Sequence, residues 1–191
     1  MCVGAHTVRP YGMCPVWRRK MDHKITLLPL EGIDFDHTRL SFGSTRTEAE
    51  SALGPVQNVH RNRCYFFNGE LALDFDGADR LEFIEFLGGP GGTLSPALFG
   101  LSVFDTDAQE LLDLLEEKGG PADDVDGGYT VTVPSLSVGL YREISPADVE
   151  ELVRAMSRMD VTTLGHVDLA GEQRRAQRWE TIGIGRENYY T

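Results

Sequence analysis

The sequence predicts an α+β protein in which two tandem helix-plus-antiparallel-sheet modules pack as one compact unit with C-terminal helices. A short capped helical pattern is followed by alternating strand patterns between residues 40 and 87, and the same order returns after a glycine-rich break. Of the 191 residues, 41% are hydrophobic, which is enough for a packed core and argues against general disorder. We interpret the repeated order as a duplication, and a chance similarity between two α+β units is the alternative.

The predicted organisation follows changes in composition and the glycine-proline breaks. Residues 1–20 are basic and aperiodic, and we interpret them as a disordered or non-native extension, with a basic binding arm as the alternative. The further segments expected are a first α+β module over 21–87, a Gly/Pro linker over 88–92, a second α+β module with a covering helix over 93–170, and a C-terminal helix and tail over 171–191.

The helix of the first module is expected to begin after Thr45. Thr45 and Glu48 have the spacing of a capping box, in which each side chain accepts a hydrogen bond from the other residue's backbone N–H. Gly54 and Pro55 end the helix, because glycine readily adopts the left-handed conformation and proline cannot continue the helix.

Antiparallel strands are expected on both sides of this helix. Lys24–Leu30 is a short apolar strand, and Asn68-Gly69 is a two-residue hairpin signal because both positions tolerate positive φ. Residues 71–76 alternate, which predicts a strand with one buried face and one wet face. A turn then leads into the strand Leu81–Phe86.

The second module repeats this order after the linker. Ala97–Phe104 is expected to be one strand, and Thr106 and Gln109 repeat the capping-box spacing before an apolar helical face. Two alternating strands are expected within residues 129–140. The linker itself is not a phosphate-binding loop, since no Lys-Ser/Thr pair follows it and no helix begins directly after it.

The last third of the chain is expected to add helices around the sheet. Ser145-Pro146 starts a helix whose apolar face is expected to cover the sheet, and Val161–Leu169 is expected to be one more strand. Glu172–Trp179 is polar and expected to be helical, and the segment after it is expected to be a tail.

Charge and cysteine content exclude several classes of function. The net charge is −12, and residues 21–191 carry −16 because residues 1–20 hold four basic and no acidic residues. Such a chain repels nucleic acid and anionic membranes, and it attracts a basic partner or simply stays soluble. The chain lacks an 18-residue apolar run and a secretory signal, and its three cysteines show no paired spacing, so we expect a cytoplasmic protein without disulfides or a zinc site.

No motif in the sequence predicts catalysis or a bound ion. The acidic runs around Asp74, Asp76 and Asp79 lack the spacing and the closing glutamate of a calcium loop. A polar cluster at residues 34–37 is interpreted as a solvated turn, with a metal site as the alternative. We therefore expect no catalytic residue, no metal and no cofactor, although carboxylates that the fold brings together remain an alternative.

An open antiparallel sheet with polar and aromatic outer positions is a common recognition surface, and this is the function that the sequence favours. The candidate interface residues are Tyr65, Phe67, Asp74, Asp76, Tyr141, Tyr189 and Tyr190. For each aromatic residue among them, a place in the core is the alternative.

The first module resembles a known small unit. Its helix, with Phe42-Gly43-Ser44 before it and Leu53-Gly54-Pro55 at its end, precedes strands ending in Asp74-Phe75-Asp76-Gly77. This is similar to the helix-plus-meander unit of bacterial outer-membrane assembly lipoproteins and of the secreted β-lactamase-inhibitory proteins, which contain the unit twice. The resemblance implies a non-enzymatic domain whose sheet face grips another protein.

The sequence therefore predicts an acidic, non-enzymatic protein-binding module, and its specific form would be a bacterial immunity-type inhibitor of a basic toxin or enzyme. A small enzyme or ligand-binding domain that uses acidic residues on a sheet face is the alternative, and a homodimer is a third.

Overall fold

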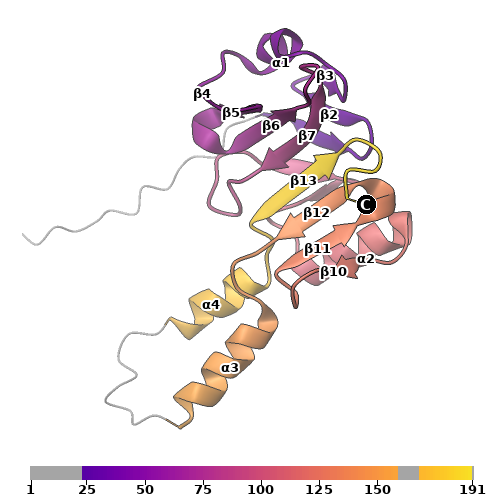
Figure 1. Cartoon of the computed structure of the whole chain (residues 1–191). Coiled ribbons are helices and arrows are strands. Elements are labelled where there is room, and N and C mark those ends of the chain that lie inside the picture. The colour runs from indigo at the N-terminus through magenta and orange to yellow at the C-terminus, as the bar shows by residue number, and fades with distance from the viewer. Residues whose placement is uncertain (1–22, 159–167, 191) are drawn as a thin grey trace, which may run out of the picture.

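The computed structural model describes residues 23–158 and 168–190, in which four α-helices accompany two β-sheets (Figure 1). The predicted fold class is confirmed: the protein is α+β, and helix followed by antiparallel strands occurs twice. The expectation for residues 1–20 lies outside the described residues. None of the helices in the described ranges has the length and apolar character needed to cross a membrane.

An eight-stranded antiparallel sheet forms the larger layer, in the order β10-β11-β12-β13-β7-β6-β5-β4. Its strands are β4 (Asn58–His60), β5 (Arg63–Phe66), β6 (Leu71–Phe75), β7 (Leu81–Phe86), β10 (Asp123–Asp124), β11 (Thr130–Val133), β12 (Val138–Tyr141) and β13 (Thr181–Gly185). The first half follows helix α1 and the second half follows helix α2. Their last strands, β7 and β13, pair at the centre, so the two halves form one continuous sheet.

A five-stranded sheet covers part of one face of the larger sheet, with the order β3-β2-β1-β8-β9. Its strands are β1 (Ile25–Leu28), β2 (Gly32–Phe35), β3 (Thr38–Ser41), β8 (Pro96–Leu98) and β9 (Leu101–Ser102). The single strand predicted over Ala97–Phe104 is wrong, since Phe99 and Gly100 have positive φ and turn the chain between β8 and β9. β8 pairs in parallel with β1, which ties the second module to the first.

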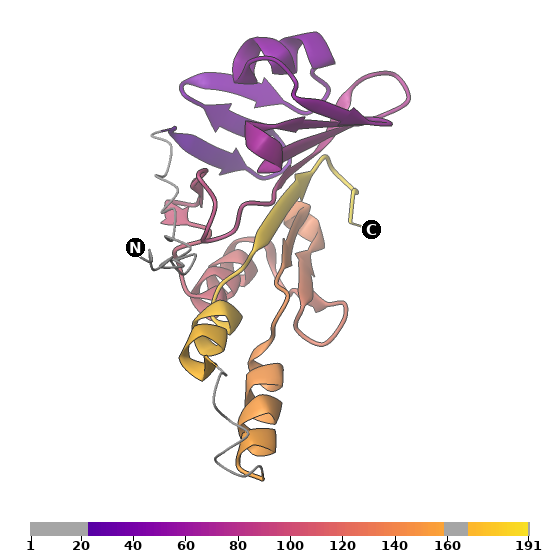
Figure 2. The ribbon, with the colours of Figure 1, turned by 90° about the vertical axis from the view of Figure 1, so that its left-hand side faces the viewer.

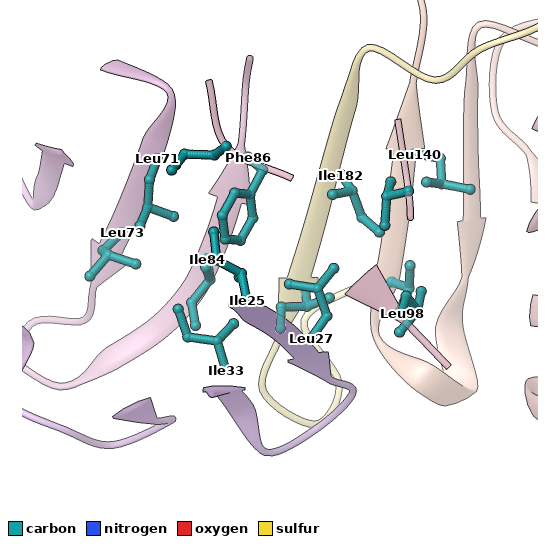
Figure 3. Packing of buried hydrophobic residues seen from close by; sticks show 14 of the residues in the cluster. Ile25, Leu27, Ile33, Leu71, Leu73, Ile84, Phe86, Leu98, Leu140 and Ile182 are labelled. Carbon is teal, nitrogen blue, oxygen red and sulfur yellow. The ribbon is translucent and has the colours of Figure 1, made fainter. Parts of the chain in front are cut away.

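The core lies between the two sheets. Figure 3 shows residues of both sheets pointing toward one another, and each is at most 2% exposed: Ile25, Leu27, Ile33, Leu71, Leu73, Ile84, Phe86, Leu98, Leu140 and Ile182. The helices α1 (Arg46–Leu53) and α2 (Ala108–Gly119) add Leu53 and Leu111 to the same core. We call the face of the eight-stranded sheet that borders this core the inner face, and the opposite one the outer face.

Helix caps follow the sequence closely, with one shift. The capping box of Thr45 and Glu48 forms at α1 as predicted. At α2 the cap is Asp107, whose carboxylate accepts from the Gln109 N–H at 3.0 Å, and the predicted cap at Thr106 is wrong by one residue. An aspartate at this position satisfies the same orphan N–H groups and adds a negative charge at the positive end of the helix.

The hairpin between β5 and β6 is longer than the predicted two-residue turn. Phe66 pairs with Leu71, so four residues connect the strands. Phe67 and Asn68 both have positive φ, and the Phe67 ring stacks on Phe35 at 5.2 Å. The extra residues therefore return an aromatic side chain to the core.

Helices α3 (Pro146–Met156) and α4 (Leu169–Ala176) pack against each other and project away from both sheets (Figures 1 and 2). The Ser145 cap forms as predicted, but α3 does not cover the sheet as expected. The inner face is already covered by the smaller sheet, α1 and α2, so α3 packs against α4 instead, with Val149 buried and Val153 left exposed. The strand expected over Val161–Leu169 lies largely outside the described residues, and Leu169 begins α4.

The segment expected to be a C-terminal tail contains β13, the central strand of the larger sheet. Ile182 and Ile184 are fully buried on the inner face. Before the strand, Trp179 is buried, donates from Nε1 to the Ala108 carbonyl at 3.0 Å, and lies under the Arg142 guanidinium. This anchor fixes where the chain returns from the helical projection into the sheet.

Candidate functional site

The register of the eight-stranded sheet determines which residues lie on the outer face. One row of paired residues crosses all eight strands: Asn58, Tyr65, Ala72, Glu85, Gly183, Gly139, Thr132 and Asp123. Their strand neighbours Cys64, Ile84 and Ile182 are buried in the core. Because successive side chains alternate between faces, the row points away from the core.

The structure brings five of the seven candidate interface residues together on or over this face. Tyr65 lies in the row, while Asp74 and Tyr141 lie two positions along their strands from Ala72 and Gly139 and so share the face. The tyrosines at 189 and 190 fold back over the same face.

The other two candidates lie elsewhere. Phe67 packs against Phe35 in the hairpin turn. Asp76 lies in the turn after β6, where its carboxylate accepts from the N–H groups of Ala78 and Arg80 and pairs with Arg186 at 3.3 Å.

An ion triad occupies the outer face beside Tyr65. Arg63 donates to Asp74 at 2.7 Å and also to Glu85, with all three side chains about one fifth exposed. Burial raises the pKa of Asp74 despite the opposing effect of Arg63. The Arg63 guanidinium also lies over the Tyr65 ring, 5.5 Å from its centroid.

Sequence reasoning missed Arg63, Glu85 and Phe83 as members of this surface. All three occupy outer positions of strands, and Arg63 lies two residues before Tyr65. This i, i+2 spacing is the signal that could have identified Arg63. Phe83 is harder to assign, because the register shift between Asp74 and Phe75 changes the alternation at that end of the strand pair.

An aromatic cluster lies at the seam between the two halves of the sheet. The Phe83 and Tyr189 rings stack with centroids 4.4 Å apart, and Tyr190 meets Phe83 edge to face at 6.0 Å. Beneath Tyr190 lie Gly139 and Gly183. Burial raises the pKa of both tyrosines above the ordinary value of 10.

The most acidic part of the chain lies at the β10 end of the eight-stranded sheet, partly on α2, which covers the inner face, and partly on β10, which borders the outer face. Residues 105–126, which we call the acidic strip, contain nine Asp or Glu residues and one Lys. All but Asp107 of these acidic residues are exposed. The strip includes α2 and the edge strand β10, where Val125 beside it is 63% exposed.

The glycine-rich loop at residues 88–92 is organised by a buried side chain. The Glu70 carboxylate accepts from the Thr93 N–H at 2.6 Å, the Thr93 hydroxyl at 2.9 Å and the Leu94 N–H at 3.0 Å. A Cβ on Gly88 would lie 3.0 Å from this carboxylate, so glycine allows the close approach. The structure thus supplies its own anion next to the loop.

A groove of about 670 Å³ runs between this loop and α4. Arg174, Arg175 and Arg178 line it, together with Glu180. Arg175 pairs with Glu180 at 3.2 Å and with two further glutamates, so much of the positive charge is matched within the protein.

The polar cluster at residues 34–37 is engaged in local contacts. Asp36 pairs with His23 at 2.5 Å and accepts from the Lys24 N–H, contacts that lower its pKa, while Asp34 pairs with Arg39 at 2.8 Å. Across residues 23–158 and 168–190, no group of three or more His, Cys, Asp or Glu side chains is placed to hold a metal ion.

Comparison with models of protein families, with curated proteins and with solved structures yields no match to this chain. The resemblance to assembly lipoproteins and β-lactamase-inhibitory proteins therefore stays a prediction.

Proposed function

We propose that the chain is a non-enzymatic, acidic protein-binding module that uses the outer face to grip a basic protein, in the manner of an immunity-type inhibitor. The observation that carries this proposal is the asymmetry of the eight-stranded sheet. Its inner face packs against the smaller sheet, α1 and α2, whereas its outer face carries aromatic and charged side chains and is not covered by a layer of helices (Figure 1).

The composition of the outer face supports a protein partner. Tyr65, Tyr141 and Tyr189 supply large rigid rings, and aromatic residues and arginine are enriched at the centres of interfaces. The triad around Arg63 is already satisfied internally, so it can be covered by a partner without leaving an unpaired charge.

Charge supports a basic partner. The acidic strip reaches the outer face at its β10 end, and an extended patch of one sign accelerates the encounter with a patch of the opposite sign. The proposal places the protein in the cytoplasm, where Cys64, a buried thiol, would stay reduced.

The test is affinity capture from host lysate with the full chain, followed by kinetic measurement on the captured protein. The variant Tyr65→Ala should weaken the complex through its dissociation rate. The triple variant Glu110→Gln, Glu117→Gln, Asp123→Asn should slow association roughly tenfold at low salt, and high salt should remove this difference.

A matched control neutralises three exposed acids away from the outer face and the strip, Glu50→Gln, Glu150→Gln and Glu151→Gln, and should bind as the wild type does. Binding that neither Tyr65→Ala nor the strip variant changes would contradict the proposed surface. An association rate that is independent of salt would contradict the electrostatic part.

A small enzyme or ligand-binding site is the second candidate, favoured by one observation. Asp74 and Glu85 both contact Arg63, and the pKa of Asp74 is raised. A metabolite that binds the wild type and fails to bind Asp74→Asn would favour this candidate. A homodimer through the outer face would appear in light scattering as twice the chain mass, and Tyr65→Ala would return it to a monomer.

A further inference from the structure

The residues after β13 fold back over the outer face, and the C-terminal end lies over the second half of the sheet (Figure 1). Arg186 holds the base of this segment through ion pairs with Asp76 and Glu82 and through its N–H on the Glu82 carbonyl. Beyond this base, the tyrosine rings pack on Phe83 and on each other.

Tyr190 fills a slot that exists because two neighbouring strands carry glycine on their outer side. A Cβ on Gly139 would lie 2.3 Å from the Tyr190 Oη, and one on Gly183 would lie 2.8 Å from the same oxygen. Gly139 and Gly183 are directly paired between β12 and β13. Any other residue at either position would close the slot, with Phe83 forming its side wall.

The ring in this slot is held without a polar anchor. Tyr190 makes no hydrogen bond to any residue that the structure describes, whereas the strands below it keep their own ladder. Tyr190 is half-buried, and its ring can therefore leave the slot without breaking a bond of the sheet.

We propose, building on the proposed function, that the slot formed by Gly139, Gly183 and Phe83 is a binding site for an aromatic side chain of the partner, and that Tyr190 occupies it in the free chain. Around this segment four carboxylates, Asp74, Asp76, Glu82 and Glu85, share only two arginines, Arg63 and Arg186, so the surface beside the slot keeps an excess of negative charge. The partner segment that fits is therefore an aromatic residue flanked by lysine or arginine.

A self-occupied site lowers the apparent affinity for an external ligand by the fraction of time the site is open. Removal of the internal ring should then expose the slot. The direct probe is the protein's own C-terminal peptide, residues 186–191 (RENYYT), added to a chain that ends at Arg186 and so keeps β13 and the Arg186 ion pairs.

The readout is the amide chemical shifts of Gly139 and Gly183 in labelled protein. The shortened chain should bind the peptide saturably at roughly millimolar concentration, as expected for one or two ring contacts. The full chain should show no shift at these glycines, and neither should a peptide in which the last tyrosine is alanine.

Gly139→Ala in the shortened chain should abolish peptide binding while the other sheet resonances stay in place. If that variant does not fold, the full chain carrying Tyr190→Ala replaces it, and its slot should accept the peptide. No saturable shift in the shortened chain, or an equal shift in the full chain, would overturn the inference.

A second arm separates this inference from the proposed function. The captured partner should bind Tyr190→Ala about tenfold more tightly than the wild type, because the internal competitor is gone. An unchanged affinity would overturn the docking role of the slot and leave the protein-binding function standing. If the peptide binds the shortened chain but no partner is captured from the lysate, the slot as an aromatic binding site stands and the proposed protein-binding function fails.

Discussion

Replacement of Glu70 by alanine should destabilise the protein severely for a single substitution. Glu70 is 7% exposed, and its Oε2 accepts three hydrogen bonds from Thr93 and Leu94. Hydrogen bonds to a charged group contribute roughly 1.5–3 kcal/mol each, and a buried donor left without an acceptor costs about 1–3 kcal/mol. Leu94 is 1% exposed, so water reaches its N–H poorly. We expect the free energy of unfolding to fall by about 4 kcal/mol.

The assay is urea unfolding at neutral pH, with midpoint and slope both measured. Glu70→Gln keeps an acceptor oxygen for the same donors and should lose only about half as much. Glu150→Ala, an exposed position on α3, is the matched control and should stay within about 0.5 kcal/mol of the wild type. A loss below about 1 kcal/mol for Glu70→Ala would refute the conclusion that this carboxylate organises residues 88–94.

Three further predictions concern packing and ionisation. Gly183→Ala places a Cβ 2.3 Å from the Phe83 ring and should lower the free energy of unfolding by about 1–3 kcal/mol, whereas Gly91→Ala, with open space around it, should be neutral. Hydrogen bonds from Tyr129 and Ser145 lower the pKa of Asp148, so Asp148→Asn should be less stable than the wild type above pH 3.8. This difference in the free energy of unfolding should vanish as the pH falls through the lowered pKa. In alkaline titration followed by ultraviolet absorbance, Tyr190 should ionise well above pH 10, and this ionisation step should be absent in Tyr190→Phe.

Each of these predictions has a clear contrary result. Equal stability of Gly183→Ala and Gly91→Ala would mean that β13 is not packed beneath Phe83. A constant gap between Asp148→Asn and the wild type across the acid range would mean that the charge of Asp148 contributes nothing. The stability of the wild type should also fall as pH rises above 10, since the unfolded chain ionises Tyr190 first, and an identical alkaline slope in Tyr190→Phe would contradict this.

Local signals predicted the helices and most strands well. The capping box at Thr45 and the helix cap at Ser145 formed where the sequence placed them, because a cap depends on residues only three positions apart. Gly54 ended its helix as predicted, since its positive φ is also a local property of the chain. The errors were also local: Phe99-Gly100 broke an apolar run into two strands because a phenylalanine adopted positive φ.

The candidate site was predicted in part. Tyr65, Asp74 and Tyr141 share the outer face because they occupy alternate strand positions, which the sequence pattern already indicates. That Arg63 joins Asp74 to Glu85 could not be predicted, since strand register brings together residues 11 and 22 positions apart in sequence. The packing of Phe67 against Phe35 likewise depends on the meeting of two separate sheets.

By itself the sequence determined the α+β class, the repeated order of helix and strands, the helix caps at Thr45 and Ser145 and the acidity of the chain, since these depend on neighbouring residues and on composition. Only the tertiary structure decided that β13, read as a tail, would be the central strand, and that α3 would project instead of covering the sheet. The physical reason is burial of apolar side chains. Ile182 and Ile184 are fully buried because β13 pairs between β7 and β12. The inner face is already covered by the smaller sheet, α1 and α2, so α3 packs elsewhere. The same pairing brings Gly139 beside Gly183 and so forms the slot that Tyr190 fills.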